Sequence, residues 1–503
     1  MCIKLHTNLN KIYIIDFVFF YMKRQKITLV ELPPTSFGRL NASKVKDIYT
    51  RFKLPARANP LLQAILLNEG YGDVKSIDPN VNWGGKLTRH DLKRITESDY
   101  LLLSAITRTI PQTKELAQIY RKANPQGKII AGGPHVTFMP EETLEWADFV
   151  VRHEGDKTLV ELLETLENNK SLEGVKGISY VSGNKIINNE CREFLTEEEL
   201  DLLPNPDFSI YSKKTKGVVN TSRGCPYGCN FCSVTNFYGK GYRRKSNLKI
   251  LEEINAVGEK NNDFFGDDNF GTRKSPTKEL LRELIKIGNK TKYTCQLSVN
   301  SAFLYPEGND IDEEFLSLLK QANFFAVCLG VESINKDTLK GFNKSATVER
   351  NKIAVKEFRK AGLWEHVMMM VGGDSDTNES LDETLDWAMQ YADSVQFFAP
   401  LPLPGTPFTS EMEKQGRILT KDYYLYDGFH VIIEPKNFSP YGLQMKIWDM
   451  NSKFYSIKKN PFIKDSAYPW YKEGVHLYAQ KIAWDISHDP QTREYFERLK
   501  EME

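Results

Sequence analysis

The stretch TSRGCPYGCNFCSVTNF, residues 221–237, holds three of the chain's seven cysteines: Cys225, Cys229 and Cys232. Their C-x3-C-x2-C spacing places three thiolates on one short loop, directly after the apolar run GVVNTSR at 217–223. A cubane [4Fe–4S] cluster is normally held by four cysteines, so three would leave one iron open to an outside ligand, as in catalytic metal sites. The spacing therefore predicts a catalytic [4Fe–4S] cluster on a loop at the end of a strand.

Two other metal-binding functions fit this loop less well. Structural zinc prefers four ligands in paired spacing, such as two C-x2-C motifs, and the chain has no second C-x2-C. Simple electron-transfer ferredoxins also supply a fourth cysteine. Cys295 and Cys328 stand alone within expected strands, where we predict that they are small core residues.

The composition is that of a globular protein, and 503 residues favour two or three domains. Because 67 Lys and Arg nearly balance 66 Asp and Glu, we expect no nucleic-acid partner. An odd, unevenly spread set of cysteines does not resemble a disulfide framework, so we expect a reducing cytoplasm.

The first residues differ from the rest of the chain. The run IYIIDFVFFYM at 12–22 is apolar but short and carries Asp16, whereas a membrane-spanning helix needs about 20 apolar residues. We therefore expect no transmembrane segment and interpret 1–21 as an upstream extension, with a misassigned start as one origin. A weak membrane-surface anchor is the alternative, and a domain start is predicted at Met22.

Strand-like and helix-like runs alternate through the first third of the chain, which predicts a parallel sheet with ligands at the carboxyl ends of its strands. Expected strands cover 26–32, 73–78, 100–106, 128–135 and 148–156, and expected helices cover 58–70, 110–123 and 157–167. A hairpin is expected over 177–189, around Ser-Gly-Asn.

A second alternating series begins at the cysteine loop and predicts a partial (β/α)6 barrel with its chemistry at the strand ends. Its expected strands are 217–223, 263–270, 293–300, 324–333, 366–373 and 394–400. The aromatic-rich tail that follows is expected to be a mostly helical cap. The predicted organisation is α/β, with an extension (1–21), a Rossmann-like domain (22–190), a linker (191–216), the barrel (217–419) and the helical extension (420–503).

The cysteine loop, with Phe231 just before its last cysteine, resembles the signature of the radical S-adenosylmethionine (SAM) superfamily. Later strand ends resemble that superfamily too: GDDNF (266–270), GVES (330–333), MVGGDSDT (370–377) and PLPGTP (402–407). Upstream, AGGPHVTFMPEE and VRHEGDKTLVELLE resemble the cobalamin-binding domain of one large subgroup. The tail is similar to that of hopanoid methylases and other lipid-modifying members, and the resemblance covers residues 26–500.

The resemblance implies roles for individual residues. Cys225, Cys229 and Cys232 would hold the cluster, and SAM would chelate the fourth iron and be cleaved to a 5′-deoxyadenosyl radical. Phe231 would lie near the adenine of SAM, and Asn300 and Glu332 would make polar contacts to SAM or be ordinary strand-end residues. Asp267 and Asp268 would face the same cavity, or Asp267 would cap a turn.

Cobalamin is expected although the chain lacks the Asp-x-His-x-x-Gly motif of many cobalamin proteins. Many members of the subgroup that this chain resembles also lack the motif, and the resemblance implies that cobalamin can bind without that histidine. Ser104, Gly132, Gly133 and His135 lie at expected strand ends and are the candidate cobalamin contacts, because the two glycines permit a close approach of the backbone. The alternatives are a plain tight turn and a domain that has lost its cofactor.

With both cofactors, the resemblance implies cobalamin-dependent methylation of an unactivated carbon. A cyclase or a carbon–carbon bond-forming enzyme is the alternative within the family, and a non-catalytic corrinoid or redox sensor is the alternative outside it. The substrate would be a small or lipid-like molecule, and electrons would come from a donor such as ferredoxin or flavodoxin.

Overall fold

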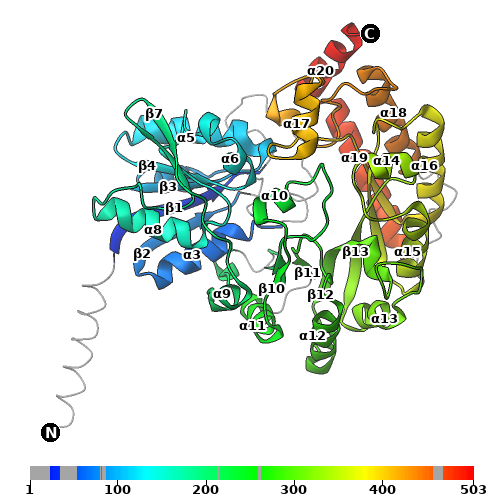
Figure 1. The fold of residues 1–503 in the computed structure, drawn as a ribbon, viewed down its shortest axis with the longest axis horizontal. Coiled ribbons are helices and arrows are strands. Elements are labelled where there is room, and N and C mark those ends of the chain that lie inside the picture. The colour runs from blue at the N-terminus through cyan, green and yellow to red at the C-terminus, as the bar shows by residue number, and fades with distance from the viewer. Residues whose placement is uncertain are drawn as a thin grey trace.

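The computed structural model describes residues 23–33, 54–79, 81, 86–211, 215–258, 262–456 and 468–503. The predicted N-terminal extension lies outside these residues. The described chain forms two sheet-containing halves that lie side by side (Figure 1), the first coloured blue to cyan and the second green to red.

The first sheet is doubly wound. Its strands are β1 (Lys23–Glu31), β2 (Tyr71–Ile77), β3 (Tyr100–Ser104), β4 (Lys128–Gly132), β5 (Phe149–Val151), β6 (Ile178–Ser182) and β7 (Lys185–Asn188). They lie in the order β2-β1-β3-β4-β5-β6-β7, with β1 to β5 parallel and the β6–β7 hairpin antiparallel. The order 2-1-3-4-5 places the topological switch, where such folds bind ligands, between β1 and β3. The predicted Rossmann-like sheet and hairpin are confirmed.

Helices cover both faces of this sheet, so its central strands are apolar on both sides. In β3, Leu101 and Leu103 pack into one core cluster, while Tyr100 and Leu102 pack into the other. The helices are α3 (Ala58–Asn68), α4 (Arg89–Thr96), α5 (Ile110–Ala123), α6 (Pro134–Phe138), α7 (Pro140–Thr143) and α8 (Gly155–Glu167). A 3-10 turn, η1 (Thr107–Thr109), precedes α5.

The second sheet confirms the predicted partial barrel. Its strands are β8 (Val218–Val219), β11 (Asn262–Phe265), β12 (Lys292–Ser298), β13 (Phe324–Glu332), β14 (Trp364–Met370) and β15 (Ser394–Phe398). All six are parallel and lie in sequence order. The helices between and after them are α11 (Asn247–Val257), α12 (Lys274–Ile287), α13 (Glu313–Gln321), α14 (Lys336–Gly341), α15 (Val348–Lys360), α16 (Asn378–Tyr391) and α17 (Pro407–Lys414).

Two expected strands of the barrel are shorter than predicted. The run at 217–223 divides into β8 and β9 (Ser222–Arg223), because the intervening Thr221 bonds through its backbone N–H to Asp267. The run at 263–270 ends at Phe265, because the acidic residues that follow bind the start of the cysteine loop instead of continuing the ladder.

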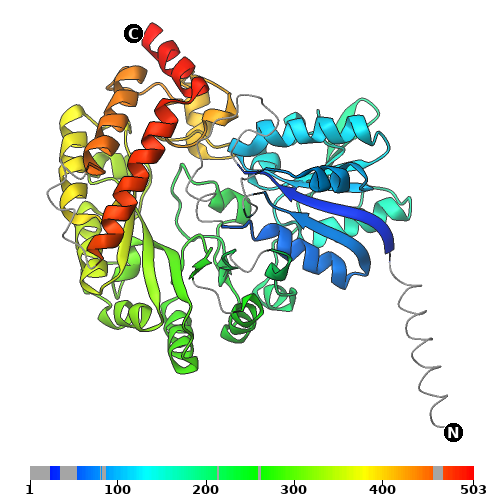
Figure 2. The ribbon, with the colours of Figure 1, turned by 180° about the vertical axis from the view of Figure 1, so that it is seen from behind.

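The tail is helical only in part. Its helices are α18 (Pro440–Phe454), α19 (Pro469–Ser487) and α20 (Pro490–Glu501). Figure 2 shows α19 and α18 lying beside each other on the outer side of the barrel, where Gln480 donates to the Tyr455 carbonyl oxygen at 2.6 Å. The aromatic stretch at 423–438 instead forms the short turn η4 (Tyr423–Leu425) and irregular loop.

The segment predicted as a linker contains α9 (Glu197–Leu202), with Thr196 as its N-cap, and the turn η2 (Phe208–Ile210). The domain boundaries themselves stay predictions. None of the helices in the described part of the chain is long and apolar enough to cross a membrane.

A buried ion-pair triad joins the two halves. Arg57 precedes α3 in the first half and donates to both carboxylate oxygens of Glu253 in α11, at 3.0 and 2.9 Å from Nη2. Lys245 binds the same carboxylate, and the Asn220 N–H donates to it at 3.2 Å. The Glu253 side chain is only 1 % exposed, so one buried carboxylate balances two cations.

Candidate active site

The three cysteines lie on a loop whose base is closed by a two-stranded ribbon. β9 pairs antiparallel with β10 (Arg243–Arg244), and residues 224–242 between them carry the cysteines and α10 (Val234–Tyr238). The turn into the loop requires Gly224: its φ is +87°, and a Cβ there would lie 2.4 Å from the Gly241 carbonyl oxygen. The sequence therefore folds this segment as a closed loop at the carboxyl end of β8.

The donor set fits an iron–sulfur cluster. All three thiols are free and partly buried, and burial raises their pKa values, that of Cys232 to about 12. Iron binding would deprotonate them, because thiolates are the ligand form. The described residues contain no group of three or more His, Cys, Asp or Glu side chains close enough to hold a single metal ion. Cysteines that each bind a different iron of a cluster do not require such a group.

A turn after α14 holds the cysteine loop from one side. Asn230 Nδ2 donates to the Gly341 carbonyl oxygen at 2.9 Å, and the Asn230 N–H donates to that of Phe342 at 3.2 Å. Asn343 Nδ2 donates to the Gly228 carbonyl oxygen at 2.6 Å. Phe231 packs edge-to-face on Phe342, with ring centroids 5.6 Å apart. These contacts fix the loop around its second and third cysteines.

The two aspartates after β11 have separate roles. Asp267 is fully buried and accepts hydrogen bonds from the Thr221 and Ser222 hydroxyls, so it holds the backbone before the loop. Asp268 accepts from the Gly224 N–H at 3.1 Å, and burial raises its pKa to about 6. The carboxyl group of Asp268 therefore lies directly beside the start of the cysteine loop.

The structure places both predicted SAM contacts at strand ends. Asn300 lies in the turn η3 (Val299–Ala302) after β12, where its Oδ1 accepts from Arg350 Nε at 3.0 Å. Glu332 ends β13 with φ +64°, a left-handed conformation that is rare for this residue type and often marks a functional position.

Lys344 is a site residue that no motif in the sequence predicts. Its ammonium pairs with Glu332 at 2.8 Å, and the two side chains are 10 and 13 % exposed. Burial would lower the pKa of Lys344, but Glu332, Cys229 and Cys232 raise it above its ordinary value. A lone lysine in a polar loop carries no motif that could have indicated this place.

The predicted cobalamin contacts lie at the carboxyl edge of the first sheet. Ser104 ends β3 and Gly132 ends β4, and these two residues are partners in the parallel ladder. Gly133 has φ +106°, and a Cβ there would lie 2.7 Å from the Ala105 carbonyl oxygen. Ile106, which is not among the predicted contacts, is 49 % exposed at the same edge. A glycine-lined edge with an exposed apolar side chain fits a large, flat ring.

His135 is placed differently from the expectation. Its side chain is fully buried, with Nδ1 3.2 Å from the Thr107 hydroxyl and the ring edge-to-face on Tyr423 at 4.7 Å. The ring therefore has no surface exposed at the edge, and a role for His135 in binding cobalamin stays a prediction. Tyr423 donates to Glu142 at 2.8 Å, so His135 belongs to a contact between the first half and the tail.

The topological switch holds a further missed residue. Glu31 ends β1, and burial, with the nearby Asp78 adding to it, raises the pKa of Glu31 to about 8. Ser104 on the neighbouring strand hydrogen-bonds to it. A carboxyl group with a raised pKa therefore lies at the end of β1, next to the switch between β1 and β3 where a doubly wound sheet binds its ligand.

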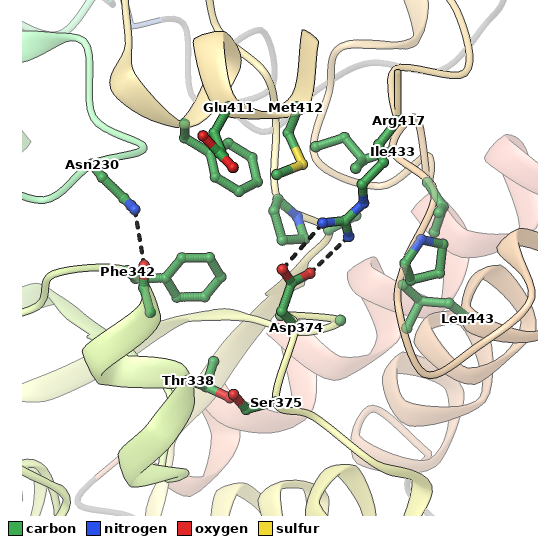
Figure 3. Close-up of a pocket in the computed structure, with 18 of the residues that line it drawn as sticks. Asn230, Thr338, Phe342, Asp374, Ser375, Glu411, Met412, Arg417, Ile433 and Leu443 are labelled. Atoms are coloured by element: carbon green, nitrogen blue, oxygen red, sulfur yellow. Dashed lines mark hydrogen bonds and ion pairs between the residues drawn. The ribbon is translucent and has the colours of Figure 1, made fainter. Parts of the chain in front are cut away.

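A cavity of about 350 Å³ lies next to the cysteine loop, beyond the ends of β14 and β15. Figure 3 shows Arg417 and Asp374 facing each other in it, and their two hydrogen bonds are 2.7 and 3.1 Å long. Phe342, Met412 and Leu443 contribute apolar walls. Its volume is at the lower end of the roughly 300–1,000 Å³ typical of ligand pockets.

Comparisons with known proteins agree with this geometry. The model of the Radical SAM superfamily matches residues 219–388, which include the cysteine loop, and that of the B12 binding domain matches residues 50–163. The chain is 28 % identical over 462 residues to an uncharacterized methyltransferase of Pyrococcus horikoshii, covering 88 % of this chain and 95 % of that protein.

A second relative is the anaerobic magnesium-protoporphyrin IX monomethyl ester cyclase of Cereibacter sphaeroides, 28 % identical over 426 residues, covering 80 % of this chain and 67 % of that protein. Among solved structures, the cobalamin-dependent SAM radical enzyme OxsB with aqua-cobalamin bound has a TM-score of 0.69 at 19 % identity, covering 95 % of this chain and 76 % of that one. The predicted resemblance and the predicted fold class are thus confirmed. The chain carries a radical SAM domain and, ahead of it, a B12-binding domain.

Proposed function

We propose that the protein is a radical SAM enzyme that uses cobalamin to methylate an unactivated carbon of a small organic molecule. The observation that carries this proposal is the pairing, in one chain, of a three-cysteine loop at the carboxyl edge of a barrel with a B12-binding sheet of order 2-1-3-4-5. The methyltransferase relative supports methyl transfer.

Three cysteines would hold the cluster and leave one iron for SAM: Cys225, Cys229 and Cys232. The Lys344–Glu332 pair and Asn300 would contact the polar groups of SAM, and Phe231 would lie near its adenine. When bound, the cluster supplies the electron that cleaves SAM, and cobalamin supplies a carrier for the methyl group. The turn after α14 and the partly buried cysteine loop would keep water from the reacting groups.

At the B12-binding edge, Gly132 and Gly133 would face the ring of cobalamin, and Ser104 with Glu31, whose pKa is raised, would offer hydrogen bonds to its polar groups. His135 would act by packing against Tyr423 rather than by ligating cobalt. The site is thus proposed to bind cobalamin without a histidine below the metal.

The cavity beside Asn230 is proposed to take an apolar, lipid-like part of the substrate, because Phe342, Met412 and Leu443 line it. A small electron-transfer protein such as ferredoxin or flavodoxin would reduce the cluster. A reducing compartment such as the cytoplasm suits the chain, since the six cysteines among the described residues are all free.

The cyclase relative gives a second candidate function: ring formation without methyl transfer. The anaerobic, reduced protein should release 5′-deoxyadenosine from SAM, and the Cys229→Ser variant should not. With SAM carrying a deuterated methyl group and a metabolite extract, methylation should place the deuterated methyl group in a product, whereas cyclisation should not. If reconstituted wild-type protein releases no 5′-deoxyadenosine, the proposed radical chemistry is wrong and the sensor alternative is favoured.

A further inference from the structure

Two acidic residues of the B12-binding domain bind the arginine that precedes the cysteine loop. Arg223 Nη1 and Nη2 donate to the two Asp156 carboxylate oxygens at 2.8 and 2.9 Å, and Nη1 also donates to Glu154 at 2.8 Å. The Arg223 side chain is 11 % exposed and both acids are 6 % exposed. Such a two-pronged contact fixes orientation as well as distance.

Glu154 also holds the other end of the cysteine loop. Arg243 lies opposite Arg223 in the β9–β10 ribbon and donates to both oxygens of Glu154, at 3.0 and 2.9 Å. Two like charges side by side on a ribbon repel each other unless acids balance them. Glu154 and Asp156 of the B12-binding domain supply that balance.

These four residues, Glu154, Asp156, Arg223 and Arg243, form an interdomain clasp. Glu154 is the N-cap of α8, three positions after the end of β5, and Asp156 lies in the first turn of α8, at the carboxyl edge of the B12-binding sheet. Burial raises the pKa of Asp156, but the neighbouring Arg223 outweighs this effect. The pKa of Asp156 is therefore below its ordinary value, and the carboxylate stays charged. The clasp thus joins the edge proposed to face cobalamin to the loop that carries the three cysteines.

A neighbouring contact reinforces the clasp from the same edge. His153, with φ +60°, lies between β5 and Glu154, and its Nδ1 donates to the Phe237 carbonyl oxygen at 2.9 Å. Phe237 belongs to α10, which Figure 1 shows between the two halves. The B12-binding domain therefore contacts the cysteine loop before its first cysteine and after its last one.

We propose that Arg223, held by Asp156 and Glu154, is a positioning residue that sets where the cysteine loop stands relative to the B12-binding edge. This inference rests on the proposed function. Without the clasp, both cofactors stay bound, but the distance between them varies from molecule to molecule. The clasp would therefore hold the two cofactors at one distance, as a reaction that uses both of them requires.

The test is pulsed dipolar EPR on the full chain, loaded with the cluster in its reduced state and with cobalamin in its cobalt(II) form. Both centres are paramagnetic, so the measurement reports the distance between them without any substrate. We expect one narrow distance distribution for the wild type and a shifted or broadened one for Asp156→Asn and Arg223→Lys. Neither amide nor ammonium can complete the two-pronged contact.

Arg282→Gln is the matched control, since its ion pair with Glu314 is about half exposed and lies between α12 and α13. It should leave the distribution unchanged, and all variants should retain the iron and cobalt of the wild type. An unchanged distribution in Asp156→Asn would overturn the clasp alone. A wild-type protein that holds no cobalamin would overturn the proposed function and the clasp together.

Discussion

Replacing Glu253 with Gln should destabilise the contact between the two halves of the molecule. The carboxylate is 1 % exposed and accepts hydrogen bonds from Arg57, Lys245 and the Asn220 N–H. The amide keeps the shape but not the charge, so two largely buried cations lose their counter-ion. Removing one partner of a buried ion pair costs about 3–5 kcal/mol.

The expected loss is measurable by calorimetry on cluster-free protein. At about 2–4 °C per kcal/mol for a domain of this size, the unfolding midpoint of Glu253→Gln should fall by roughly 6–20 °C. Glu252→Gln is the control, because Glu252 is 52 % exposed and lies 4.0 Å from Lys249. Surface substitutions usually change the free energy of unfolding by no more than about 0.5 kcal/mol, so its midpoint should shift by at most about 1–2 °C.

The stabilisation should also depend on pH. Burial raises the pKa of Glu253, but Arg57 and Lys245 lower it from 4.5 to about 2. A carboxyl group whose pKa is lower in the folded than in the unfolded state stabilises the fold at pH values above its unfolded pKa. It loses this stabilisation as the pH falls through its folded pKa. The difference in unfolding midpoint between wild type and Glu253→Gln should therefore be largest above pH 4.5 and should shrink as the pH falls toward 2. Equal midpoints for Glu253→Gln and Glu252→Gln at pH 7 would refute the reasoning.

Three further changes test the cofactor sites. Cys229→Ser should lose most of the bound iron, whereas Cys191→Ser, at an exposed free thiol, should keep it; equal iron contents would contradict the assignment. Lys344→Met should lower the reduction potential of the cluster in a spectroelectrochemical titration, because it removes a buried positive charge beside Cys229. Lys344→Arg keeps the charge and should leave the potential unchanged. An unchanged potential in Lys344→Met would count against this role of Lys344. Gly133→Ala should reduce cobalt per chain because its Cβ would lie 2.7 Å from Ala105, but Gly183→Ala, with nothing within 4 Å, should retain cobalt; full retention in both would be inconsistent with a close approach at this edge.

The sequence predicted the regular elements well, because periodicity and burial agree in them. The expected helix at 110–123 has the observed bounds of α5, and Cys295 lies in the barrel core as predicted. The β9–β10 ribbon could not be predicted, since each arm is two residues long and shows no periodicity.

Long-range contacts account for most of what the sequence could not predict at the site. The burial of His135 depends on Tyr423, which comes from the tail. The clasp joins Asp156 to Arg223 across 67 positions, a pairing that no local pattern in the sequence predicts. Cys328, expected in the core, is only partly buried on β13. Local patterns predict strands and the cysteine loop, whereas pairing between distant side chains requires the folded chain.

Metal analysis of the full chain, purified and reconstituted without oxygen with iron, sulfide and cobalamin, tests the central claim most directly. About four irons and one cobalt per chain, without zinc, are the expected result for a three-cysteine cluster beside a B12-binding domain. Zinc in place of iron, or iron without any retained cobalt, would contradict it.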